Sequence, residues 1–124
     1  MSAKHILLID DEPEIREIVR VSLELVGGWD VSATGSAREG LTLAADQRPD
    51  AILLDVMMPD MDGPTTFQAL QAAPETCAIP VILLTAKVQS ADLRRFDQLG
   101  VAATIAKPFD PLTLPSQVAT ALGW

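Results

Sequence analysis

The chain lacks tyrosine altogether, has one cysteine, and has few basic residues. Because Cys77 is alone, it cannot form a disulfide within the chain, and no apolar run reaches the roughly 20 residues that span a membrane. The N-terminus has neither the basic nor the long apolar segment of a secretion signal, so we expect a reducing, cytoplasmic setting and no membrane partner. Nine Lys and Arg against 17 Asp and Glu give a net charge of −8. This balance argues against direct nucleic-acid binding and favours proteins or cations as partners.

The 124 residues, 48% of them hydrophobic, predict a single domain over residues 1–124. Its clearest signal is three continuous apolar runs, at residues 5–9, 51–54 and 81–84, each followed by a polar residue. Short runs without polar alternation are typical of parallel strands covered on both faces. Residues 30–34 and 104–107 are weaker candidates for two further strands.

Amphipathic stretches predict a helix after each strand. Residues 15–26 keep helical spacing after Pro13 and are followed by two glycines that end the helix. Residues 36–39, Ser-Ala-Arg-Glu, have the form of a capping box that opens a second helix. Further helices are expected near residues 65–72, 90–99 and 114–122.

Five alternations of strand and helix with short connections predict an α/β fold. We expect a five-stranded parallel sheet in the order 2-1-3-4-5, doubly wound, with five helices covering both faces. In such a sheet, ligands bind beyond the carboxyl ends of the strands, where the strand order reverses. The first and third strands lie side by side at that point.

Polar residues gather at this predicted edge. Asp10 and Asp11 follow the first strand, Asp55 the third and Thr85 the fourth, and Lys107 ends the fifth. Three close carboxylates should bind a hard divalent cation, and Mg²⁺ suits a site with few protein oxygens. A carboxylate beside bound Mg²⁺ can act as a nucleophile toward phosphorus, while a nearby ammonium neutralises the phosphoryl charge. The pattern therefore predicts phosphoryl chemistry.

The sequence resembles the receiver domains of bacterial two-component response regulators over nearly its whole length. The resemblance rests on the acidic pair at 10–11, Asp55 after "AILL", the loop "MMPDMDG", Thr85 in "VILLTA", and "KPF" from Lys107. It implies a flavodoxin-like fold of the chemotaxis-regulator type. It also implies an output that is binding rather than turnover, with phosphotransfer and dephosphorylation catalysed by the domain itself.

The resemblance implies a role for each matching residue. Asp55 would be the phosphoacceptor, with Thr85 and Lys107 contacting the phosphoryl group. The implied Mg²⁺ ligands are Asp10 and Asp11, directly or through water, with Asp55 and the main-chain carbonyl of Met57. A cis peptide bond between Lys107 and Pro108 is also implied. The phosphoryl donor would be a histidine kinase or a histidine phosphotransfer protein, and the downstream protein target is unknown.

The sequence departs from the family at Thr104, where receivers usually carry an aromatic residue. Metal binding and phosphorylation are unaffected by this change, but the usual route by which phosphorylation reaches a partner is placed in doubt. We expect the side chains of Met57 and Met58 to pack, and Gly63 to serve the turn of its loop.

Two other functions fit parts of the pattern. A Mg²⁺-dependent phosphohydrolase resembling the haloacid-dehalogenase superfamily also uses an Asp nucleophile in a D-x-D-G motif, here matched only by residues 60–63. In that superfamily the first Asp directly ends a strand, whereas Asp60 follows a proline. A degenerate receiver that is never phosphorylated is the other alternative. An EF-hand is excluded because Met58 and Ala69 stand where oxygen ligands are needed.

Overall fold

A computed structural model of the chain describes residues 4–86 and 90–124, with residues 90–93 and 97 described by their backbone alone. The loop that follows Thr85, residues 87–89, lies outside the described residues. The strands are β1 (His5–Ile9), β2 (Asp30–Thr34), β3 (Ala51–Asp55), β4 (Val81–Thr85) and β5 (Ala103–Ala106). The helices are α1 (Pro13–Val21), η1 (Ser22–Val26), α2 (Ala37–Gln47), α3 (Gly63–Ala72), α4 (Ser90–Leu99) and α5 (Leu114–Leu122).

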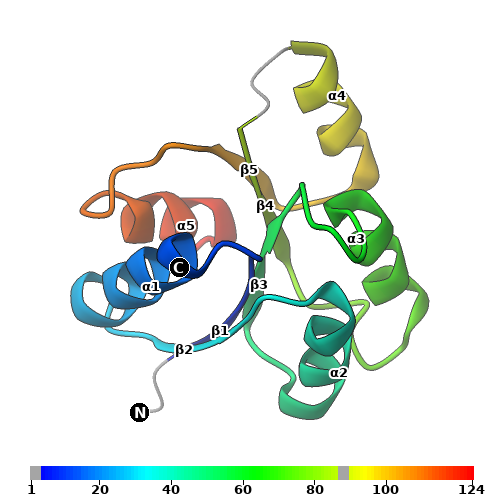
Figure 1. Cartoon of the computed structure of the whole chain (residues 1–124), viewed down its shortest axis with the longest axis horizontal. Helices are drawn as coiled ribbons and strands as arrows, with labels where there is room; N and C mark the ends of the chain where they lie inside the picture. The colour runs from blue at the N-terminus through cyan, green and yellow to red at the C-terminus, as the bar shows by residue number, and fades with distance from the viewer. Residues whose placement is uncertain (1–3, 87–89) are drawn as a thin grey trace.

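The strands form one parallel sheet in the order β2-β1-β3-β4-β5, which confirms the predicted fold (Figure 1). Each neighbouring pair is parallel, so all five carboxyl ends lie at the same edge. Every residue of β3 and β4 is buried, as their continuous apolar runs predict.

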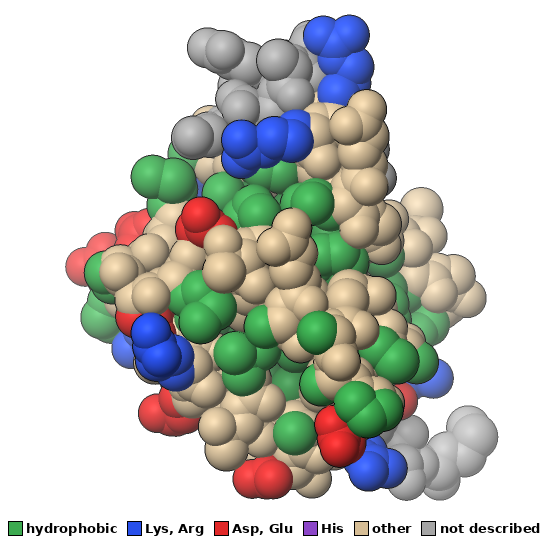
Figure 2. Space-filling model, turned by 90° about the vertical axis from the view of Figure 1, so that its right-hand side faces the viewer, with side chains coloured by type: hydrophobic (Ala, Val, Ile, Leu, Met, Phe, Trp, Pro, Cys, Tyr) green, Lys and Arg blue, Asp and Glu red, His purple; other side chains and the backbone are tan. Residues whose placement is uncertain are grey.

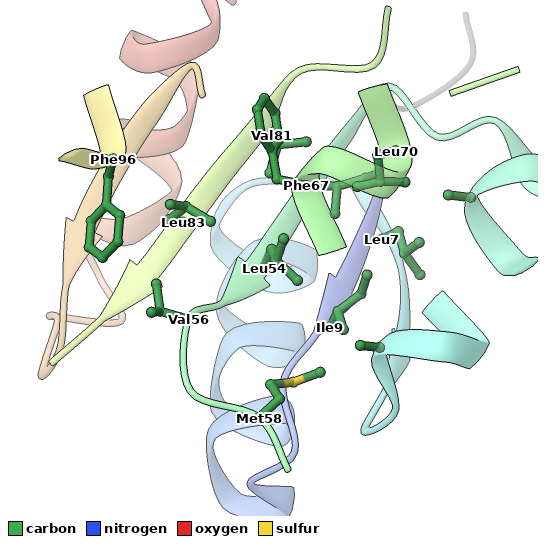
Figure 3. Close-up of a cluster of buried hydrophobic side chains, with 13 residues drawn as sticks. Leu7, Ile9, Leu54, Val56, Met58, Phe67, Leu70, Val81, Leu83 and Phe96 are labelled. Carbon is green, nitrogen blue, oxygen red and sulfur yellow. The ribbon is translucent and has the colours of Figure 1, made fainter. Parts of the chain in front are cut away.

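The sheet separates two hydrophobic cores. On one face, α2, α3 and α4 cover alternate strand residues such as Leu7, Ile9 and Leu54 (Figure 3). On the other face, α1, η1 and α5 cover the intervening residues, among them Leu8 and Leu53. The outer side of the first layer mixes hydrophobic and polar side chains (Figure 2). None of the helices in the described ranges is both long and apolar enough to cross a membrane.

The first predicted helix divides into two kinds of turn. Residues 13–21 are α-helical, but Ser22–Val26 form a π-helix in which the Gly27 N–H reaches the Ser22 carbonyl over 3.2 Å. The change from α-helix to π-helix occurs at the buried Ser22, whose hydroxyl donates to the carbonyl of Pro111, in the segment between β5 and α5. This long-range contact is invisible in the local sequence.

The boundaries near the site differ slightly from prediction. β5 ends at Ala106, so Lys107 lies just beyond its strand instead of within it. Helix α3 begins two residues early, because the Asp62 carboxylate accepts the Thr65 N–H at 2.8 Å. Gly63 is the first residue of this helix, and a Cβ there would lie 2.8 Å from Val56 Cα. Glycine is therefore needed at position 63 because the backbone of Val56 packs against it, and less because of the turn geometry.

Candidate functional site

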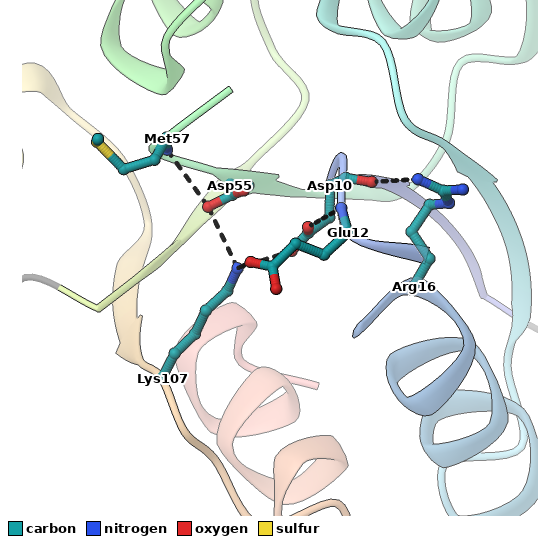
Figure 4. Close-up of polar contacts among 6 residues, drawn as sticks. All are labelled: Asp10, Glu12, Arg16, Asp55, Met57 and Lys107. Atoms are coloured by element: carbon teal, nitrogen blue, oxygen red, sulfur yellow. Dashed lines mark hydrogen bonds and ion pairs between the residues drawn. The ribbon is translucent and has the colours of Figure 1, made fainter. Parts of the chain in front are cut away.

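The strand order brings the predicted site residues to one edge of the sheet. Asp10 directly follows β1, and Asp55 is the last residue of the neighbouring β3. Thr85 ends β4 and is buried, and Lys107 follows β5, where its N–H donates to the Thr85 carbonyl over 2.8 Å. Figure 4 shows Asp10, Asp55 and Lys107 converging from separate strands.

The three acids form a compact cluster. Asp10, Asp11 and Asp55 each offer a carboxylate oxygen, and these oxygens lie within 4.8 Å of one another. Oxygens on opposite sides of a Mg²⁺ ion are about 4.2 Å apart at its usual bond length of about 2.1 Å. The donor set and its spacing therefore fit Mg²⁺ after a small adjustment. Asp10 and Asp55 are buried, while Asp11 is half-buried and gives the cluster access to solvent.

Lys107 neutralises part of this cluster. Its Nζ lies 2.8 Å from Asp10 Oδ2, 3.3 Å from Asp55 Oδ1 and 3.8 Å from Glu12 Oε1 (Figure 4). Burial by itself lowers the pKa of Lys107, but the hydrogen bond and charge of Asp10, followed by those of Asp55, outweigh burial and raise that pKa. The ammonium is therefore held in its charged form between the two carboxylates.

The charged form of the Asp55 carboxylate is disfavoured at this site. Burial, followed by repulsion from Asp10, raises its pKa from 3.8 to about 6. The Lys107 ammonium and the Met57 N–H, which donates to Asp55 Oδ1 over 3.3 Å, oppose this rise only partly. An added cation would stabilise the carboxylate, so the geometry favours metal binding beside Asp55.

Three hydrogen bonds hold the main chain and side chain of Asp10 in place. Its N–H donates to the Thr34 carbonyl at 3.0 Å, and its Oδ1 accepts the Glu12 N–H at 3.0 Å. Its main-chain carbonyl accepts Arg16 Nη1 at 2.9 Å (Figure 4). Arg16 therefore supports the acidic pair from α1. Sequence reasoning missed this residue, because an Arg on an amphipathic helix gives no signal of where its side chain goes.

The two methionines after Asp55 behave differently. The Met58 side chain packs into the core beside Ile9 (Figure 3), as expected. The expectation for Met57 was wrong, because its side chain is 61% exposed. Its backbone bond to Asp55 holds it at the site, and the assignment of its carbonyl as a metal ligand stays a prediction.

The cis peptide bond between Lys107 and Pro108 is present as the family resemblance implies. Thr104, which replaces the usual aromatic residue, lines a groove of about 690 Å³ between β5 and α5, together with Phe109 and Gln117. Its buried Oγ1 has no hydrogen-bond partner among the described residues. The groove thus lies beside a small residue of β5, at the position where receivers usually carry an aromatic ring.

A doubly wound sheet with paired acids at its switch point, facing a buried aspartate and a lysine, is the arrangement that the family resemblance implies. Comparison with known families agrees: the profile of the "Response regulator receiver domain" family matches residues 6–119. The chain belongs to this family, whose members are phosphorylation-switched signalling domains of two-component systems.

Curated relatives are longer than this chain. It is 42% identical over 106 residues to the "DNA-binding dual master transcriptional regulator RpaA" of Synechocystis sp., covering 85% of this chain and 43% of that protein. It is 34% identical over 122 residues to the "Phosphate regulon transcriptional regulatory protein PhoB" of Pseudomonas aeruginosa, covering 98% and 53%. The chain thus spans about half the length of the curated relatives it matches.

Solved structures match the chain over nearly its full length. The chemotaxis response regulator CheY4 of Vibrio cholerae has a TM-score of 0.90 at 28% identity, covering 97% of this chain and 99% of that one. The receiver domain of sensor histidine kinase PA1611 from Pseudomonas aeruginosa has a TM-score of 0.87 at 28% identity, covering 99% and 100%. That structure is described with a magnesium ion coordinated in its active-site cleft.

Proposed function

We propose that the chain accepts a phosphoryl group on Asp55 from a histidine kinase or histidine phosphotransfer protein and thereby changes its protein-binding surface. The observation that carries this proposal is the position of Lys107, whose ammonium contacts both Asp10 and the buried Asp55. The same ammonium would also attract the negative charge of an incoming phosphoryl group.

In the proposed reaction, an Asp55 carboxylate oxygen attacks the phosphorus of a phosphohistidine. A P–O bond forms, the P–N bond breaks, and the imidazole nitrogen keeps the electron pair. Lys107 Nζ lies 3.3 Å from Asp55 Oδ1, and after the transfer its ammonium binds a negatively charged oxygen of the phosphoryl group. The Thr85 hydroxyl, at the end of the neighbouring strand, donates to another phosphoryl oxygen.

Mg²⁺ bound by Asp10, Asp11, Asp55 and the Met57 carbonyl would supply positive charge that lowers the barrier for transfer. The acids fit this role because their oxygens lie within 4.8 Å of one another. The magnesium described for the PA1611 receiver domain supports the choice of ion.

The contacts of the loop acids do not favour the phosphohydrolase alternative. Asp60 accepts hydrogen bonds from Ser36, Ala37 and Arg38, and Asp62 caps α3. Both carboxylates of the D-x-D-G segment are thus engaged in capping helices, whereas Asp55 ends its strand beside Lys107.

Acetyl phosphate with Mg²⁺ tests the proposal. Intact-mass measurement should find one added phosphoryl group that hydroxylamine removes, as expected of an acyl phosphate. Asp55→Asn should abolish the label, and Asp60→Asn should retain it. Loss of the label in the Asp60 variant alone would favour the phosphohydrolase, and an unlabelled wild type would favour the degenerate receiver.

A further inference from the structure

The turn that leads from β2 into α2, residues 34–38, contacts both Asp10, which follows β1, and Asp60 in the loop that follows Asp55. On one side the turn contacts the residue that follows β1, because the Thr34 carbonyl accepts the Asp10 N–H at 3.0 Å. Arg16 reinforces this side, because Nη1 binds the Asp10 carbonyl and would lie 2.5 Å from a Cβ on Gly35. The guanidinium is therefore packed directly against the turn.

On its other side, the same turn holds Asp60 of the loop that follows Asp55. The Asp60 carboxylate accepts the Ser36 hydroxyl at 3.1 Å, the Ala37 N–H at 3.3 Å and the Arg38 N–H at 3.2 Å. The bond from Arg38 contributes most to lowering the pKa of Asp60. A charged carboxylate at the start of α2 also interacts favourably with the helix dipole.

The loop that bears Asp60 is the one that carries Met57. At its base, the Gly63 N–H donates to the Val56 carbonyl at 2.9 Å, and Met58 anchors it in the core. Asp60 adds the tie to α2, an element outside the loop's own strand and helix. Met61 also packs against that core, so without Asp60 the loop would keep its apolar anchors and lose its hydrogen bonds to the start of α2.

We propose that Asp60 is a positioning residue for the metal site, holding the Met57 loop in register with Asp10 and Asp11 through the turn at residues 34–38. This inference rests on the proposed function, in which the Met57 carbonyl and the acids share Mg²⁺. Asp60 supplies no ligand. Its loss removes no ligand but loosens the loop between its apolar anchors, so metal binding has to restrict that added motion, and affinity falls.

Mg²⁺ titration calorimetry on folded protein tests this inference with three variants. Asp60→Ala should raise the Mg²⁺ dissociation constant on the order of fivefold, a smaller effect than loss of a direct partner of a ligand. Asp60→Asn should raise the constant only about twofold, because its amide oxygen can replace Oδ2 and accept from Arg38 N–H and Ser36 Oγ, although its NH2 group cannot accept the Ala37 N–H. Asp62→Ala is the matched control, since it removes the same charge and a helix cap from the same loop.

Amide hydrogen exchange without metal gives a second readout. The Ala37 and Arg38 N–H groups should exchange faster in Asp60→Ala than in wild type, and at the wild-type rate in Asp62→Ala. A merely structural cap would lower the melting temperature and leave the Mg²⁺ dissociation constant unchanged, and that result would overturn the proposal. Equal weakening in Asp60→Ala and either Asp60→Asn or Asp62→Ala would also overturn it, because long-range charge would then explain the loss.

The failure of this inference can be separated from failure of the proposed function. A wild type that does not bind Mg²⁺ overturns both. A wild type whose binding is lost in Asp11→Asn but kept in Asp60→Ala overturns only the role of Asp60.

Discussion

Lys107 Nζ lies 2.8 Å from Asp10 Oδ2, although 97 positions separate the two residues in the sequence. The contact joins the first and last strands of the sequence, because Asp10 follows β1 and Lys107 follows β5. Asp55 ends β3, which lies between those two strands in the sheet, and its Oδ1 is 3.3 Å from the same ammonium. Lys107 thus balances two buried carboxylates, and the stability of the metal-free protein depends on that balance.

Replacing Lys107 with Met should destabilise the metal-free protein. Two buried carboxylates would lose their cation, and we expect a loss of roughly 1–3 kcal/mol, below the value for a fully buried pair. Urea unfolding without metal measures this loss, and saturating Mg²⁺ should reduce the difference in unfolding free energy between the variant and wild type. Lys107→Arg, which keeps the charge, should be less affected. A metal-free Lys107→Met protein as stable as wild type would contradict the importance of this contact.

Metal-free stability should fall as the pH rises through the pKa of Asp55. This pKa is about 6 in the folded protein, against an ordinary value of 3.8. Between these values the folded state binds more protons than the unfolded chain, so protonation of Asp55 stabilises the fold at low pH and this contribution is lost above pH 6. The gap between the pKa values corresponds to roughly 3 kcal/mol.

Asp55→Asn tests this pH dependence, because its amide cannot ionise. Without metal, the variant should be more stable than wild type at pH 7.5 and should lose most of the decline between pH 4 and 7 in urea unfolding. Asp46→Asn, on the exposed side of α2, should follow the wild-type curve. The assignment to Asp55 fails if its variant declines with pH as steeply as wild type.

Mg²⁺ should raise the melting temperature of the wild type, because the ion binds the folded state and relieves repulsion among the acids. Asp11→Asn should be at least as stable as wild type without metal, and it should lose most of the stabilisation by millimolar Mg²⁺. Asp30→Asn, at the opposite edge of the sheet, should keep the wild-type response. Equal responses in Asp11→Asn and wild type would remove Asp11 from the metal site.

The conformational change caused by phosphorylation should be transmitted from the site by Thr85 and not by a bulky aromatic ring on β5. Thr104 is small and faces the groove beside α5, so it provides no large side chain to rearrange. A phosphoryl mimic shifts a two-state equilibrium only by its differential affinity for the states. Beryllofluoride should therefore perturb backbone amide signals strongly near Asp55, Thr85 and Lys107, and weakly at residues 116–120.

Thr85→Ala is the informative variant for that experiment. It should suppress the beryllofluoride-induced changes in the α4 region while leaving those at Asp55. Large changes along α5 that persist in Thr85→Ala would mean that the signal leaves the site by another route.

The sequence by itself determined the sheet and the location of the site. Continuous apolar runs have no polar face to expose, so they predict parallel strands buried on both sides, and the structure has them there. Ser36 likewise begins α2 as its capping box predicts, with its Oγ accepting the Glu39 N–H at 3.2 Å. Since parallel strands share one carboxyl edge, Asp10, Asp55 and Lys107 had to meet there once the strand order was known.

Only the tertiary structure decided which partner each side chain found. The capping of α2 by Asp60 and the bond from the Ser22 hydroxyl to the Pro111 carbonyl join elements distant in the sequence, and the bond from Arg16 to the Asp10 carbonyl joins α1 to the end of β1. Local patterns carry the period of a strand or helix, because that period follows from backbone geometry. The direction of a polar side chain depends on which donors and acceptors the packed elements bring within about 3 Å, and packing alone decides that.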